Sequence, residues 1–352
     1  MSKRFILFGL LGSIASMLFI FQHYLLPISV GLVLTLATSP LYESLDKKIA
    51  SPYKTLYIAS TLTATLFLIV FLPLIYFAGT SYQYLPKIDM DKMLAYTSII
   101  IDNLKNLPAP ITILQEPVNA FLEKFRIEGN SLNLLQVILS YAASMLAKIN
   151  NMTYKFFLIL FFYFIFNTYS KKIYIYTMEL IPLGKINKRI LFQELTNNIS
   201  SVFFGNLFSM IFQGIAFGLF IYLTTDYDAL YVGLMVAFTT AIPIIGTYLV
   251  AVPIAILEII DGNTVFAVTI ILFAIIVLSG IIDNILRLIF MNKVSKKFCL
   301  EYSINELFVL ISMIAGISVF GGWGIILAPA ILSLNLTFID MYKLSQRRRS
   351  II

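Results

Sequence analysis

The sequence predicts an all-α protein: a polytopic transmembrane helical bundle with two re-entrant or broken helical hairpins and a small extramembrane helical insert. Of the 352 residues, 59% are hydrophobic and only 12% are charged, whereas a soluble domain averages about 25% charged residues. A chain with this many apolar residues cannot cover its own surface with polar groups. Its main solvent must therefore be lipid. The hairpins are predicted because two long apolar stretches carry helix breakers in the middle and the charge pattern requires both to turn back.

The single crossings are predicted from length. A helix needs about 20 apolar residues to cross a bilayer. The stretch 5–22 follows Lys3 and Arg4, and no small-residue cleavage site comes after it, so we interpret it as a retained span and not a signal peptide. The complete set of predicted single spans is 5–22, 24–42, 54–81, 152–170, 201–224 and 264–282.

Two further apolar stretches, 229–260 and 305–342, are too long for one straight helix. Proline removes a helix hydrogen bond and glycine permits a tight reversal. The breakers inside these stretches are Pro243, Gly246 and Pro253 in the first, and Gly316, Gly321, Gly322, Gly324 and Pro329 in the second.

Basic residues occur in short runs between the apolar stretches, so the net charge of +7 is interpreted as an orientation signal and not as a nucleic-acid footprint. Alternation of the spans places the N-terminus and the segments 43–54 and 171–189 in the cytoplasm. It places 82–150 and 225–228 outside, where the long, nearly neutral insert is exempt from the charge rule.

The same rule determines the path of the two interrupted stretches. If 229–260 crossed once, the basic cluster around Lys293 would lie outside, against the rule. If both interrupted stretches return to the side they entered from, Lys293 and the Arg347–Arg349 tail become cytoplasmic. We therefore expect two hairpins, with both termini on the cytoplasmic side of a bacterial inner membrane.

These expectations divide the chain into four parts. Residues 1–81 hold the first three transmembrane helices, and 82–150 form an extracytoplasmic helical insert. Residues 151–200 hold a fourth transmembrane helix and a cytoplasmic interfacial helix over 185–200. Residues 201–352 form a core that contains both hairpins.

The hairpins are also the first candidate site. Broken helices in membranes expose half-helix ends that bind solutes or ions near the midplane. The candidate residues are Pro243, Gly246, Gly321, Gly322, Gly324 and Pro329. The alternative is that each break is a kink that serves packing alone.

Polar residues inside apolar helices supply the second set of candidates, because such residues are costly in lipid. Asp283 and Arg287 are four residues apart and can pair on one helical face. With Asn284, they are candidates for a gate or an ion-coupling cluster. Candidates for binding a cation or proton are Glu258 and Asp261, and those for a polar helix face are Asn206 and Gln213. The alternatives are solvated helix ends and hydrogen bonds that only join helices.

The chemistry that the sequence argues against is also clear. Cys299 and His23 are the single cysteine and histidine, so an intrachain disulfide, a multi-cysteine metal site and an HExxH site are excluded. No P-loop, GxSxG or Rossmann fingerprint occurs. We therefore predict a protein that is not an enzyme and has no cofactor or bound metal.

Three strings carry a family resemblance when taken in order. They are Ala241-Ile-Pro-Ile-Ile-Gly246, Asp283-Asn-Ile-Leu-Arg287, and Ala315-Gly-Ile-Ser-Val-Phe-Gly-Gly-Trp-Gly324 followed by Ala328-Pro329. With the layout of the whole chain, they resemble the autoinducer-2 exporter family of bacterial membrane proteins. The chain departs from the family pattern at Leu288, at Glu306 and near Val250.

The resemblance implies secondary export of a small signalling molecule, or cation/proton antiport, by a homo-oligomer such as a pentamer. The first hypothesis is a secondary transporter that exports a small polar signalling molecule or metabolite by alternating access. The second is a sodium (lithium)/proton antiporter. The third is a non-transporting membrane scaffold that acts through 82–150. The expected partners are the lipid bilayer, a small polar solute or a monovalent cation or proton, and further copies of the chain, with no nucleic acid.

Overall fold

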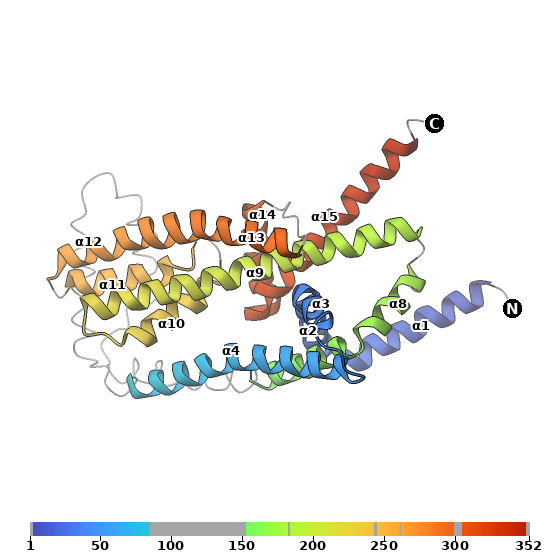
Figure 1. Cartoon of the computed structure of the whole chain (residues 1–352), viewed down its shortest axis with the longest axis horizontal. Coiled ribbons are helices and arrows are strands. Elements are labelled where there is room, and N and C mark those ends of the chain that lie inside the picture. Colours follow the sequence, from blue (N-terminus) through green and yellow to red (C-terminus); the bar gives the residue numbers. More distant parts are fainter. Residues whose placement is uncertain are drawn as a thin grey trace, which may run out of the picture.

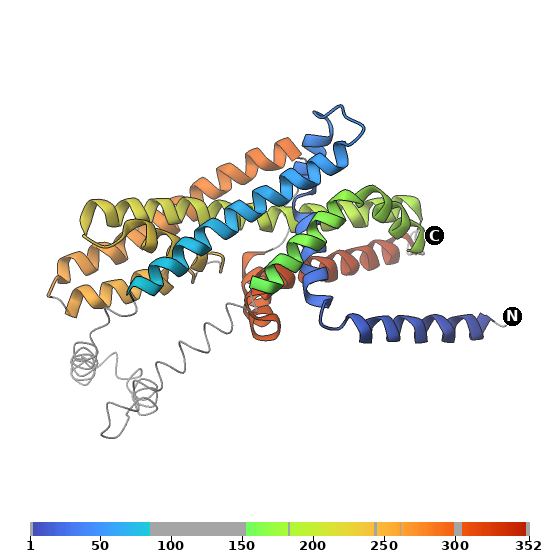
Figure 2. The same ribbon diagram turned by 90° about the horizontal axis from the view of Figure 1, so that it is seen from below.

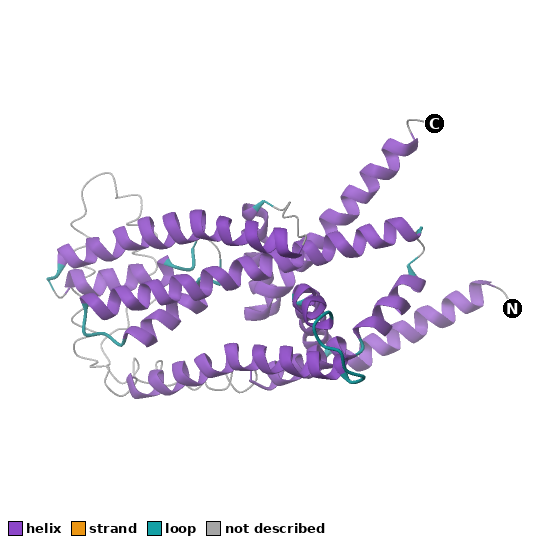
Figure 3. Cartoon of the chain, in the orientation of Figure 1, coloured by secondary structure: helices purple, strands orange, loops and turns teal. Residues whose placement is uncertain are grey.

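The computed structural model describes residues 3–84, 153–181, 184–242, 245–260, 262–298 and 305–349. All regular structure in these residues is helical, as Figure 3 shows. Four described helical stretches are long and apolar enough to cross a membrane, or up to six if each of two bent pairs forms one span. The predicted polytopic helical bundle is therefore confirmed. The predicted insert lies outside the described residues, apart from its first residues at the end of α4.

The N-terminal part differs from the two separate spans predicted at 5–22 and 24–42. Helix α1 (Lys3–Phe21) meets α2 (Leu25–Ala37) at 94°, so the two form a bent pair. A separate short helix, α3 (Ser39–Asp46), follows α2.

The break between α2 and α3 has a local cause in Pro40. Proline has no N–H and cannot bond the carbonyl four residues earlier, which belongs to Leu36. That carbonyl accepts instead from the Ser39 hydroxyl at 2.8 Å and from the Ser200 hydroxyl of α9 at 3.2 Å. The helix break is thus stabilised by a contact to the centre of the bundle.

Three long helices follow. Helix α4 (Lys54–Tyr84) contains the span predicted at 54–81. The helix Thr153–Thr168 is followed by α8 (Ser170–Leu180), bent from it by 78°. Helix α9 (Lys185–Thr224) runs for 40 residues through the bundle (Figure 1). The segment 185–200, predicted as an interfacial helix, is the first part of α9, and the predicted loop 171–189 contains α8.

The C-terminal half is built on α9. Helices α10 (Ala229–Thr239) and α11 (Tyr248–Ile260) precede a rod made of α12 (Thr264–Phe273), η3 (Ala274–Leu286) and α13 (Arg287–Phe298). The rod extends well past the span predicted at 264–282. Helix α14 (Glu306–Phe320), the short turn η4 (Gly321–Trp323) and α15 (Gly324–Arg349) complete the chain.

Two large apolar clusters hold most of these helices together, and three smaller ones add further contacts. The larger one joins α9, α10, α11, α12 and η3 through buried side chains such as Phe217, Val236 and Ile270. In it, the rings of Phe220 and Phe273 stack at 4.2 Å. The second cluster joins α2, α4 and the helix Thr153–Thr168 with α15. Figure 2 shows α4 and the green helix of the second cluster side by side, and the rings of Phe71 and Phe157 meet between them.

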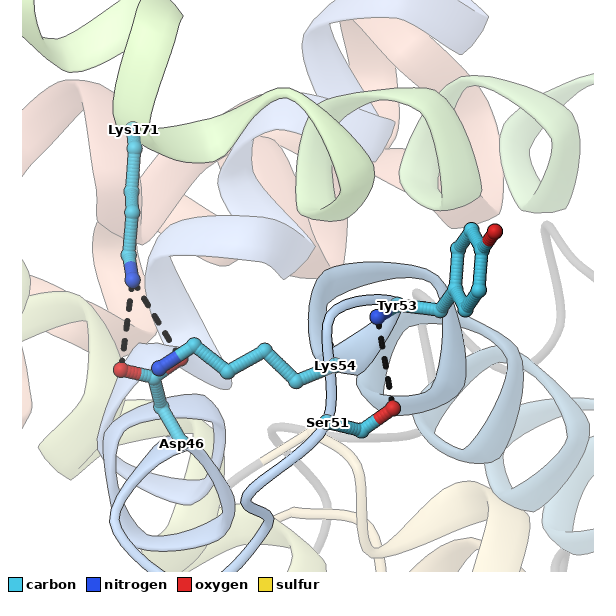
Figure 4. Close-up of polar contacts among 5 residues, drawn as sticks. All are labelled: Asp46, Ser51, Tyr53, Lys54 and Lys171. Atoms are coloured by element: carbon cyan, nitrogen blue, oxygen red, sulfur yellow. Dashed lines mark hydrogen bonds and ion pairs between the residues drawn. The ribbon is translucent and has the colours of Figure 1, made fainter.

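An ion-pair cluster joins the ends of α3, α4 and α8. The Asp46 carboxylate lies 3.1 Å from Lys54 Nζ and 3.3 Å from Lys171 Nζ (Figure 4). Burial alone would raise the pKa of Asp46, but the hydrogen bonds and charges of the two lysines outweigh it and hold the pKa below its ordinary value. The cluster puts the segments 43–54 and 171–189 at one end of the bundle, as the charge pattern requires.

Replacing Asp46 with asparagine is expected to lower stability by only about 0–1 kcal/mol, because the pairs are solvent-screened. A lowered pKa stabilises the folded state at pH values above the ordinary 3.8, and that contribution is lost as the pH falls through the folded-state value. Melting of both proteins in detergent from neutral to acidic pH measures this. A difference in melting temperature between the two proteins that persisted unchanged below the folded-state pKa of Asp46 would contradict this prediction.

Candidate functional site

The first predicted hairpin is formed by α10 and α11. These helices have 11 and 13 residues, and each is too short to cross a bilayer, which takes about 20. In Figure 1 their outer ends lie beside the end of α9 and the start of α12, and the turn between them lies deeper in the bundle. The chain therefore reverses direction within this stretch, as a helical hairpin requires.

Gly246 closes this turn. A Cβ atom there would lie 2.1 Å from the Thr239 carbonyl oxygen and 2.6 Å from the Thr240 Cα. Both are backbone atoms, so no side chain fits without displacing the turn. Pro243 lies outside the described residues.

Gln213 anchors the same turn to α9. Its side chain is fully buried, and its Oε1 accepts a hydrogen bond from the Thr247 hydroxyl at 2.5 Å. The Thr240 hydroxyl, which donates to the Val236 carbonyl at 2.6 Å, lies 3.3 Å from the same oxygen. On the other side of the hairpin, the Tyr248 hydroxyl lies 3.1 Å from the Ser279 hydroxyl of η3. The hairpin is therefore fixed to two long helices through polar contacts inside an apolar bundle.

Changing Thr247 to valine is expected to destabilise the protein by about 1–3 kcal/mol, because the change leaves Gln213 Oε1 without its shorter contact. Thermal melting of purified protein, monitored by Trp323 fluorescence, measures this. Thr224→Val is the matched control, since that exposed hydroxyl bonds only the Phe220 carbonyl within its own helix. Equal melting of the two variants would refute the anchoring role.

The predicted pairing of Asp283 with Arg287 is present in the structure. Asp283 Oδ1 lies 3.6 Å from Arg287 Nη1 and accepts a hydrogen bond from the Ser209 hydroxyl at 2.6 Å. The two side chains are 19% and 13% exposed. Gly205 of α9 lets the guanidinium approach closely, because a Cβ there would lie 3.2 Å from Arg287 Nε. Asn284 is exposed and does not join this cluster.

The carboxylate of this pair lies on an unusual helix. Residues Ala274–Leu286 form a π-helix, a rare conformation that is often found at functional sites. It carries both Ser279 and Asp283, which contact the hairpin and α9. No pattern in the sequence predicted it.

Two partners of these groups on α9, Gly205 and Ser209, were also missed, although a signal existed. Gly205, Ser209 and Gln213 follow each other at intervals of four residues, which places them on one face of the helix. Each contacts a different partner: Gly205 lies against Arg287, Ser209 bonds Asp283, and Gln213 bonds the hairpin turn. Asn206, which was predicted to share a polar helix face with Gln213, lines a cavity.

The second predicted hairpin is formed by α14 and α15. The stretch Leu307–Ile339 is long and apolar enough to cross as one helix. A Cβ on Gly316 would, however, lie 2.5 Å from Ala328 Cβ, whereas 12 residues of straight helix span about 18 Å. The reversal occurs at Gly321, which has a positive φ of 62°, and the backbones of Gly316 and Gly324 meet without side chains between them.

A cavity of about 370 Å³ lies among α2, α4, the helix Thr153–Thr168 and α9, and the tips of both hairpins reach it. Phe238 and Ala241 of the first hairpin and Gly322, Trp323 and Pro329 of the second form part of its wall. Asn206 on α9 and side chains of α2, α4 and the helix Thr153–Thr168 complete it. Predicted residues from both hairpins are thus brought together around one space.

Glu258 lies away from this cavity lining, near the open end of the first hairpin. It is 5% exposed and accepts a hydrogen bond from Asn263 Nδ2 at 3.0 Å. Asp261 lies outside the described residues. Within the described part of the chain, no group of three or more metal-ligating side chains occurs.

A polytopic helical bundle in which two helical hairpins contribute to one cavity is typical of a class of membrane proteins that move solutes. Comparison with known proteins gives the family. A model described as "AI-2E family transporter" matches residues 5–344, so the chain belongs to this family and is a membrane transporter.

Individual relatives are consistent with this. A protein of Helicobacter pylori strain 26695, described as a candidate transport protein, is 27% identical over 93% of this chain and 92% of its own length. Its counterpart in strain J99 is 26% identical over similar shares, 93% and 91%. A candidate transport protein of Mycobacterium tuberculosis strain H37Rv is 28% identical over 47% of this chain and 40% of its own length.

Proposed function

We propose that the protein is a secondary transporter that exports a small solute by alternating access through the cavity that both hairpins reach. The observation that carries this proposal is that the tips of both hairpins form walls of one cavity. Movement of either tip relative to α9 would change access to that space. The proposal places the protein in a bacterial inner membrane, with both termini in the cytoplasm and several copies in one assembly.

In this proposal, the Asp283–Arg287 pair is a gate. It joins the rod of α12, η3 and α13 to α9 through Ser209. The first hairpin is tied to the same two elements through Gln213 and Ser279. Rod, α9 and hairpin would therefore move together, and breaking the pair would uncouple them.

Flux in proteoliposomes tests the proposal. Purified protein is reconstituted, and release of radiolabelled autoinducer-2 and of a panel of small uncharged solutes is followed with and without a proton gradient. The expected result is release faster than from empty liposomes for at least one solute. Release equal to that of empty liposomes for the whole panel would contradict the proposal.

A sodium (lithium)/proton antiporter is the second candidate, and one observation favours it. Glu258 is a buried carboxylate, and its side-chain hydrogen bond within the described residues comes from an amide. A carboxylate in such a place can alternate between a proton and a cation. Everted vesicles that show no cation-dependent pH change would eliminate this candidate.

A further inference from the structure

The wall of the cavity that both hairpins reach has a distinctive chemistry. None of the described residues that line it carries a charge, and almost all are aliphatic or aromatic. The polar side chains in the wall are those of Thr38, Thr65, Tyr163 and Asn206, together with the indole of Trp323. Because a charge moved from water into such surroundings is strongly disfavoured without a partner, an ionic solute fits poorly.

Two of these five polar side chains, those of Thr38 and Tyr163, are hydrogen-bonded to each other. The Thr38 hydroxyl donates to the Leu34 carbonyl at 2.8 Å, so it must accept the hydrogen of Tyr163, whose oxygen is also 2.8 Å away. Asn206 has no hydrogen-bond partner among the described residues and is half-buried in the cavity wall. The Thr65 hydroxyl is also unpaired there, but it is exposed. The Trp323 Nε1–H is unpaired among the described residues too, but that atom is buried and does not face the open space.

We infer that the cavity binds an uncharged solute that has an apolar body, a ring or a short chain, and one hydrogen-bonding group held by Asn206. A solute with many hydroxyls would leave most of them unpaired against apolar walls, which disfavours binding. The volume of about 370 Å³ lies within the range of about 300–1,000 Å³ typical of small-molecule sites. The statement that this solute is also transported rests on the proposed function. The statement that the cavity binds it does not depend on that function.

The chain supplies its own probe. Trp323 is the single tryptophan of the sequence and lines the cavity, so contact quenching of its fluorescence reports occupancy directly. The experiment titrates 8-bromooctan-1-ol into purified full-length protein in nanodiscs of unbrominated lipid. We expect saturable quenching that octan-1-ol reverses by competition and that ribose leaves unchanged.

Two variants and a control locate the binding. Ala241→Phe fills part of the cavity and is expected to weaken saturable quenching by at least about tenfold, while Asn206→Leu removes one hydrogen bond and weakens it by about 5- to 30-fold. Ala315→Phe makes the same change at an exposed position of α14 outside the lining and should leave the affinity unchanged. The Trp323 emission maximum and size exclusion show whether each variant is folded.

A lipid chain also has an apolar body, and nanodiscs made with brominated phospholipid distinguish it. If the brominated lipid quenches Trp323 and octan-1-ol relieves that quenching, the inference is supported, because the solute then displaces the lipid chain from the cavity. Quenching that octan-1-ol does not relieve, or non-saturable quenching equal in wild type and Ala241→Phe, overturns it. Because quenching requires no translocation, absent flux with saturable quenching would refute only the proposed function, and flux without saturable quenching would refute only this inference.

Discussion

Replacing Gly246 with leucine is expected to reduce solute flux by at least about tenfold, a change of about 1.4 kcal/mol or more in the free energy that limits transport. The physical reason is steric. The first side-chain atom would lie 2.1 Å from the Thr239 carbonyl oxygen, so the turn must open. The hydroxyls of Thr240 and Thr247 would then move away from Gln213. Solute release from proteoliposomes that contain equal amounts of inserted protein measures the effect.

The matched control is Gly12→Leu. A Cβ at Gly12 in α1 meets no atom within 4 Å, so the same substitution adds bulk where space exists, and flux should stay at the wild-type rate. If Gly246→Leu inserted normally and transported at that rate too, the first hairpin would have no part in transport.

Replacing Asp283 with asparagine is expected to have the second large effect. The substitution leaves the 13% exposed Arg287 side chain without the carboxylate beside it and weakens the bond from Ser209. We expect a loss of about 1–3 kcal/mol in stability, less than for a fully buried pair because some solvent reaches the site. Flux should fall by at least about tenfold, since the contact between the rod and α9 is weakened.

A double variant separates charge from packing. Asp283→Asn combined with Arg287→Leu removes both charges, so its melting temperature should lie above that of Asp283→Asn alone. Asn284→Ala changes the exposed neighbour and should behave as wild type. If the double variant loses as much stability as the two single variants lose together, the two side chains do not act as a pair.

Several features of the site could be predicted because their cause is local. Gly246 lies in the first turn because no side chain fits there, and Gly321 lies in the second because its φ of 62° favours glycine. Asp283 and Arg287 meet because four residues make about one helical turn. The span predicted at 24–42 is divided into α2 and α3 in the structure. The prediction missed this break because it relied on apolar length and gave no weight to Pro40.

Other features depend on contacts between distant segments. The π-helix over Ala274–Leu286 has no local sequence pattern, and Gln213 acquires its role only when Thr240 and Thr247 are folded against it. The space between Phe238 and Trp323 exists only once both hairpins are packed on α9. Neither hydrophobic periodicity nor charge counting registers such contacts.

Labelling of single cysteines across the first hairpin tests the central claim most directly. In a Cys299→Ser background, cysteines are placed singly at Tyr227, before α10, and at Asn263, after α11, both of which are exposed. Intact and everted membrane vesicles are then treated with a membrane-impermeant maleimide. The re-entrant hairpin predicts that both positions react from the same side of the membrane. Reaction from opposite sides would show that 229–260 crosses the bilayer and would contradict the account.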